Sequence, residues 1–137
     1  MKLLHETRWF ESWAPVLGRI LIALLFIPAG WNKLMAFEQT AQWVGSVGVP
    51  LPEVAVVIAI LCELIGGVMI LVGYKTRLAA CALAIFTIVI TFIFHPVTVP
   101  EQAMAFWKNL AIAGGLLYVA TYGAQKLALK KCAMPAA

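Results

Sequence analysis

The chain has 137 residues, of which 64% are hydrophobic and 12% are charged, and its formal net charge is +4. A soluble domain usually carries about twice that share of charged residues, so the composition excludes an ordinary soluble protein and predicts one integral membrane domain over residues 1–137. The Lys and Arg residues mostly flank apolar runs and form no basic stripe, which excludes a nucleic-acid-binding surface.

The N-terminal segment, MKLLHETRWFESWAP, is too charged to cross a bilayer. Trp9, Phe10 and Trp13 recur at helical spacing within it. Aromatic residues of this kind anchor helices at the membrane–water boundary. We therefore predict a short N-terminal interfacial helix that precedes the first span.

Four apolar stretches approach the length of about 20 residues that a transmembrane helix needs. They cover approximately residues 15–35, 53–73, 78–95 and 103–123. The tight connection GYKTR makes the second and third spans antiparallel neighbours. The predicted fold class is an all-α integral membrane protein, a four-transmembrane-helix antiparallel bundle.

The first loop between spans, AFEQTAQWVGSVGVPLP, is the only long one. Phe37, Ala41, Val44 and Val47 share a helical face, so we expect a short amphipathic helix on the outer surface. Gly48 and the prolines after it then turn the chain into the second span.

The flanking charges predict the orientation, because Lys and Arg accumulate on the cytoplasmic side. The tails and the second loop carry the basic residues: Lys2, Arg8, Lys75, Arg77, Lys126, Lys130 and Lys131. The first and third loops carry the acidic ones: Glu38, Glu53 and Glu101. Both termini are therefore expected in the cytoplasm.

Ionisable residues within the spans are the candidate site. Each costs on the order of 2.5–3.5 kcal/mol near a helix centre, and it persists when it pairs, reaches water or serves a function. Glu63 is placed at mid-depth, and Lys33, His95 and Lys108 lie toward the outer side, whereas Arg19 lies toward the cytoplasmic side. From depth and side-chain lean we expect Glu63 to pair with Lys108, with Lys33 or Arg19 as second partners.

Each candidate can also have a purely structural role in place of a functional one. Lys33 and Arg19 can be snorkelling end anchors, and His95 can be an interfacial histidine. Asn109, next to Lys108, can be a hydrogen-bonding contact between helices. The Glu63–Lys108 pair can fix helix register without any chemistry.

The cysteines and histidines limit the chemistry further. Cys62, Cys81 and Cys132 form no C-x-x-C pair, which argues against dithiol exchange by this chain alone. The two histidines, His5 and His95, are expected on opposite sides, so bis-histidine haem ligation fails on geometry. No adequate metal-ligand set is present, and we predict no metal site.

Several motifs together resemble the DoxX family of small bacterial inner-membrane proteins. They are RILIALLFIPAGWNKL, GVPLP, CELIGGVMILVGYKTR, FIFHP and FWKNLAIAGGLL, and they cover about residues 15 to 123. The resemblance implies a four-helix bundle in the inner membrane. It carries over the polar positions Arg19, Lys33, Glu63, Arg77, His95, Lys108 and Asn109. Some members are named for a thiosulfate:quinone oxidoreductase, and others are linked to membrane redox and oxidative-stress complexes.

Three functions remain open from the sequence. The first is a quinone- or redox-associated accessory component, with Lys108, Asn109 or His95 as donors, Glu63 as acid–base group, and Trp31, Trp43 or Trp107 as stacking surface. The second is a small-molecule or proton transporter, which would need a homo-oligomer. The third is a structural subunit that binds another membrane or redox protein. Independent catalysis is not expected, although the chain is a candidate subunit of an oxidoreductase.

Overall fold

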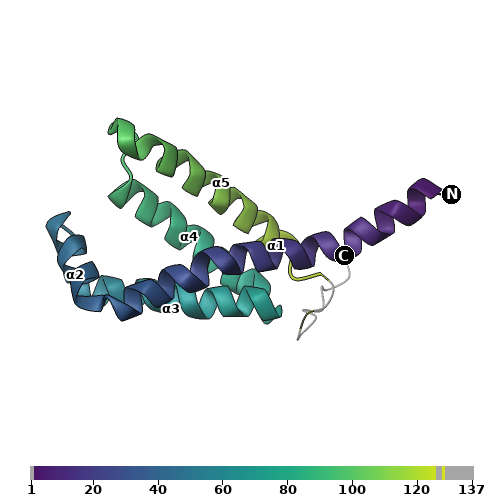
Figure 1. The fold of residues 1–137 in the computed structure, drawn as a ribbon, viewed down its shortest axis with the longest axis horizontal. Coiled ribbons are helices and arrows are strands. Elements are labelled where there is room, and N and C mark those ends of the chain that lie inside the picture. Colours follow the sequence, from purple (N-terminus) through teal and green to yellow (C-terminus); the bar gives the residue numbers. More distant parts are fainter. Residues whose placement is uncertain (1, 126–127, 129–137) are drawn as a thin grey trace.

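The computed structural model describes the backbone of residues 2–125 and 128, and the side chains of that range from residue 8 onward. Its elements are α1 (Lys2–Met35), α2 (Phe37–Ser46), α3 (Pro52–Val72), α4 (Thr76–Phe94) and α5 (Pro100–Tyr122), as Figure 1 shows. Four of them, α1, α3, α4 and α5, are long and apolar enough to cross a membrane. The predicted all-α membrane bundle is confirmed, and the last three spans begin and end within a few residues of the predicted bounds.

The N-terminal segment is helical as predicted, but it is continuous with the first span. Helix α1 runs from Lys2 to Met35 and contains Pro15 and Pro28. A proline inside a helix removes one hydrogen bond and need not end the helix. At 1.5 Å per residue α1 is about 50 Å long, more than the roughly 30 Å of a hydrocarbon core. Its N-terminal part projects beyond the other helices (Figure 1).

The two ends of the molecule differ in the connections that they carry. The α2 end carries α2 and the link between α4 and α5, and the turn end carries residues 73–75 between α3 and α4. At the turn end Gly73 has φ 77° and Lys75 has φ 41°, and the Tyr74 amide donates to the Met69 carbonyl at 2.9 Å. This left-handed cap ends α3 and reverses the chain into α4.

The long helices lie in the order α1, α3, α4, α5, each alongside the next. At the turn end all four contribute to one core, which includes Phe26, Ile70, Leu83 and Leu116. At the α2 end a second cluster joins α2 to α3. Among the described helices α5 lies alongside α4 alone, and Figure 1 shows this pair diverging from α1 and α3 toward the α2 end.

Glycines bring α3 close to both of its neighbours. A Cβ added at Gly67 would lie 2.8 Å from Ile27 of α1, and one at Gly66 would lie 3.1 Å from Leu83 of α4. In the other direction, a Cβ added at Gly30 of α1 would lie 3.0 Å from the Glu63 Cβ. Small residues at such contacts let membrane helices approach closely. The α1–α3 contact is therefore tight at the level of Glu63.

The predicted amphipathic helix in the first loop is present as α2. Ala41 and Val44 are buried against α3, as the pattern indicated. Val47 is 46% exposed, so the prediction for this residue was wrong, because α2 ends at Ser46 and the helical face ends with it. The tail residues Lys126, Lys130 and Lys131, on which the predicted orientation partly depends, lie outside the described residues.

Candidate functional site

A buried ion pair joins α1 to α3. The Lys33 ammonium donates to both carboxylate oxygens of Glu63, at 2.8 Å and 3.0 Å, and it lies 3.4 Å from the Ala29 carbonyl oxygen. The Glu63 side chain is 4% exposed and the Lys33 side chain is 30% exposed. A buried carboxylate of this kind is tolerable because an opposite charge and hydrogen bonds compensate for the lost water. Glu63 thus turns inward, as expected.

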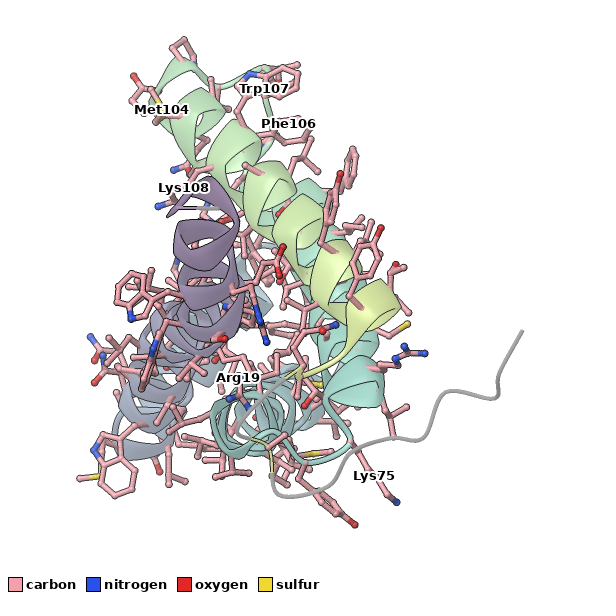
Figure 2. All side chains as sticks on the ribbon, turned by 90° about the vertical axis from the view of Figure 1, so that its right-hand side faces the viewer. Arg19, Lys75, Met104, Phe106, Trp107 and Lys108 are labelled. Atoms are coloured by element: carbon pink, nitrogen blue, oxygen red, sulfur yellow. The ribbon has the colours of Figure 1, made fainter. Side chains whose placement is uncertain are left out.

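The partner of Glu63 is Lys33, and the predicted pair with Lys108 was wrong. Lys108 is exposed on α5, and α4 lies between α5 and α3. Figure 2 shows Met104 and Lys108 on one side of α5 and Phe106 and Trp107 on the other. The pairing was predicted from depth along the membrane, and depth does not say which helices are neighbours.

Arg19 is not a second partner of Glu63 either. Its side chain is 3% exposed at the turn end, where a Cβ added at Gly73 would clash with the guanidinium group. Gly73 follows Glu63 by ten residues, which is about 15 Å along a helix. Figure 2 shows Arg19 well apart from Lys108. The six candidate residues therefore do not form one cluster.

A pocket of about 350 Å³ opens at the α2 end between α3 and α4, next to α2. This volume falls within the range of about 300–1,000 Å³ that is typical of small-molecule sites. Most of its wall is aliphatic or aromatic. The lining residues are Lys33, Thr40, Trp43, Val44, Val49, Ala55, Val56, Ile58, Ala59, Phe86, Val89, Ile90, Ile93, Phe94 and His95.

Besides the indole N–H of Trp43, the polar groups that line this pocket belong to three side chains, and the helices place these at different levels. Lys33 is held by Glu63, one helical turn below Ala59, so it lies at the inner end of the pocket. His95 is the residue that caps α4 at the α2 end, and Thr40 comes from the middle of α2. An apolar pocket with a few well-placed polar groups can bind and orient a small ligand.

Aromatic rings form part of the wall near α2. The rings of Trp43 and Phe94 stack with centroids 4.9 Å apart and an interplanar angle of 24°. Of the three tryptophans considered as a stacking surface, Trp43 lines the pocket. Trp31 and Trp107 are 55% and 60% exposed and do not line it. Their positions fit an aromatic belt at a membrane boundary.

The pocket reaches the outer surface of the helices between α3 and α4. Ile58, Val89 and Ile93 line it and are also 53%, 49% and 42% exposed. These residues belong to the two helices that are long enough to cross a membrane. Acyl chains can therefore reach the pocket from the side.

One residue beside the pocket was not among the predicted candidates. Gln102, in the first turns of α5, has its Oε1 atom 2.7 Å from Nδ1 of His95. Only a short link, residues 95–99, separates α4 from α5, and this link was the signal that could have indicated the contact. Lys108 and Asn109 lie further along α5 and do not line the pocket.

Comparisons with known proteins agree on one family. The family model described as DoxX matches residues 14–96. "Inner membrane protein YphA" of Escherichia coli (strain K12) is 32% identical over 139 residues, covering 93% of this chain and 99% of its own. "Inner membrane protein YqjF" of the same strain is 39% identical over 117 residues, covering 82% and 86%. "Putative oxidoreductase CatD" of Bacillus subtilis (strain 168) is 31% identical over 114 residues, covering 83% and 82%. No solved structure matches.

Proposed function

The chain belongs to the DoxX family of membrane proteins, and from that premise we propose that it binds the ring of a lipid-soluble quinone as an accessory component of inner-membrane redox chemistry. One observation carries the proposal: a laterally open apolar pocket contains an ammonium group held in place by a buried carboxylate. A quinone has a flat ring, a lipid tail and carbonyl oxygens that accept hydrogen bonds, which match these three features.

The polar groups of the pocket have distinct roles in this proposal. Two N–H groups of the Lys33 ammonium donate to Glu63, and the third, whose contact with the Ala29 carbonyl is long at 3.4 Å, can turn to a carbonyl oxygen of the ring. Glu63 holds the ammonium in place beside the apolar wall. Trp43 and Phe94 offer stacked faces for the ring. The name of one relative supports a redox role, because that of the Bacillus subtilis protein contains the word oxidoreductase.

A pocket-filling variant tests the proposal. Ala55 lines the pocket and is partly buried beside the α2–α3 cluster, so Ala55→Trp should fill the pocket. We expect wild-type protein in lipid nanodiscs to bind decylubiquinone, measured by native mass spectrometry, and Ala55→Trp to bind it at least about tenfold more weakly. The control Ala111→Trp, at an exposed position of α5, should bind as wild type does.

The outcome is decided by comparison of the three proteins at equal folded fraction. Thermal unfolding of each protein in detergent provides that check. Equal binding by all three proteins, or no retained quinone in the wild-type protein, would overturn the proposal.

A second candidate role is that of a subunit that binds another membrane protein through α5. The observation in its favour is a face of α5 that no described helix covers. Met104, Tyr118 and Tyr122 are 78%, 70% and 59% exposed, and a Cβ added at Gly114 or Gly115 would meet no atom within 4 Å. On this face Lys108 would meet a carboxylate of the partner. Lys108→Leu should then abolish complex formation in native membranes and leave quinone binding unchanged, and an intact complex would count against this role.

We also propose that the turn end and both termini face the cytoplasm. Arg19, Lys75 and Arg77 gather at the turn end, and Glu38, Glu53 and Glu101 gather at the α2 end, in line with the distribution of basic residues in membrane proteins. A single cysteine introduced at Tyr74 of a cysteine-free variant should resist impermeant thiol reagents in intact cells. Its labelling from outside would reverse the orientation.

A further inference from the structure

The contact between His95 and Gln102 determines which nitrogen of the imidazole carries a proton. Nδ1 of His95 faces the Oε1 atom of Gln102 at 2.7 Å. A carbonyl oxygen only accepts hydrogen bonds, so with Oε1 facing the ring this contact is a hydrogen bond when Nδ1 carries the hydrogen. In a neutral imidazole the other nitrogen, Nε2, is then unprotonated and can only accept.

A second acceptor lines the same pocket. The Thr40 hydroxyl donates its hydrogen to the Ala36 carbonyl at 2.8 Å, so its remaining capacity is to accept. The inner end of the pocket differs, because the Lys33 ammonium has donors and no acceptor. The inner end of the pocket thus holds donors, and the α2 end holds the acceptors of His95 and Thr40 beside the indole N–H donor of Trp43.

We propose that the pocket prefers a lipid-soluble ring that bears a hydroxyl group at the α2 end, as a reduced quinone does, and that Gln102 is a positioning residue for this preference. The proposal rests on the proposed quinone site and names the form that the site binds. The hydroxyl of the ring would donate to Nε2 of His95, and the oxygen at its opposite end would accept from Lys33.

The oxidised ring lacks the donor that this arrangement requires. Both of its polar atoms are carbonyl oxygens, which can accept from Lys33 but cannot donate to an unprotonated Nε2. An acceptor placed against an acceptor leaves both without a hydrogen bond in a largely apolar pocket. A site that pairs with a hydroxyl therefore discriminates against an analogue without one.

The test compares Gln102→Leu and Gln102→Glu with the wild-type protein. The Leu side chain removes the acceptor, and the Glu side chain keeps a carboxylate oxygen that can accept from Nδ1. Gln42→Leu, a change on the exposed face of α2, is the matched control. The first measurement is made without ligand: ¹⁵N chemical shifts of labelled histidine report the protonated nitrogen, and His5→Gln assigns the signals.

We expect the Nδ1–H form at His95 in the wild-type, Gln102→Glu and Gln42→Leu proteins at alkaline pH. Gln102→Leu should shift the ring toward the Nε2–H form. If Gln102 only supported the fold, Gln102→Leu would not change the tautomer of His95, and Gln102→Glu would have no tautomer to restore. An Nε2–H form in the wild-type protein would overturn the proposal.

The second measurement is the ratio of affinities for decylubiquinol and decylubiquinone in nanodiscs. We expect the wild-type protein and Gln42→Leu to favour the quinol by about tenfold or more. Gln102→Leu should lose this preference, and Gln102→Glu should retain it. Equal binding of the two forms by the wild-type protein would overturn the hydroxyl preference and leave the quinone site standing. If neither form binds, the quinone site fails and the preference fails with it.

Discussion

The α1–α3 pair and the α4–α5 pair each carry a lysine beside a tryptophan and an asparagine, yet the two lysines have different environments. Lys33, in the sequence WNKL, is paired with a buried carboxylate. Lys108, in the sequence WKNL, is exposed and has no ion pair within the described part of the chain. Neighbouring helices, and not the local motif, therefore decide what a lysine in an apolar helix does.

Glycine contacts differ between the two pairs in the same way. Gly30 and Gly67 lie where α1 and α3 touch, and each has a neighbouring atom 3.0 Å or less from an added Cβ. Gly114 and Gly115 of α5 have none within 4 Å. Helices α1 and α3 thus pack closely beside Lys33 and Glu63, whereas the face of α5 that carries Gly114 and Gly115 is uncovered.

The largest expected effect comes from breaking the ion pair. Glu63→Gln leaves the Lys33 ammonium without its counter-charge, and we expect the free energy of unfolding to fall by about 3–5 kcal/mol. Unfolding in mild detergent on titration with sodium dodecyl sulfate measures this change. Glu53→Gln, at an exposed position of the same helix, is the control and should stay near the wild-type value.

A double variant separates loss of the pair from loss of a side chain. Glu63→Gln combined with Lys33→Met removes both charges, so it should recover much of the lost stability. A single Glu63→Gln variant as stable as the wild-type protein would show that the pair does not hold α1 to α3.

An intermediate effect is expected from filling the helix contact. The methyl group of Gly30→Ala would lie 3.1 Å from the Leu64 backbone nitrogen, which cannot move aside cheaply. We expect a loss of about 1–3 kcal/mol in the same unfolding assay. Gly115→Ala on the uncovered face should be neutral or stabilising by up to about 1 kcal/mol, because alanine favours helix. Equal effects at the two positions would remove the distinction between the two helix pairs.

The smallest effect is expected at Lys108. Since it has no partner among the described residues, Lys108→Leu should change the unfolding free energy of the isolated chain by no more than about 0.5 kcal/mol. Lys33→Leu should be far more costly, because it leaves the Glu63 carboxylate buried and unpaired. A large loss for Lys108→Leu in the isolated chain would indicate a contact of Lys108 that contributes to the fold.

The spans and the inward turn of Glu63 could be predicted because they follow from local composition and from the cost of a charge in hydrocarbon. The partner of Glu63 could not. Helix α5 is apolar around most of its circumference, so its sequence does not show which face meets a neighbour. Two glycines were the signals that could have indicated the α1–α3 contact. Gly30 lies three residues before Lys33 and Gly67 lies four residues after Glu63, so each puts a small residue on the helix face that carries the charge.

The pocket itself was beyond sequence reasoning. It exists because α4 and α5 diverge from α1 and α3 at the α2 end, while α2 packs on α3 and closes one side. Such divergence depends on the summed packing of five helices. His95 was a candidate because of its residue type and depth alone. Its contact with Gln102 could not be predicted without the path of the α4–α5 link.

The side opening between α3 and α4 changes which forces can select a ligand. A ligand that enters through this opening comes from the hydrocarbon of the bilayer, so its apolar part moves from one hydrocarbon surrounding to another and gains little from the transfer. The many aliphatic residues of the wall would therefore bind almost any apolar molecule with similar affinity. Discrimination must come from the few atoms that a hydrocarbon chain cannot satisfy, and these are the side-chain nitrogens and oxygens of Lys33, Thr40, Trp43 and His95.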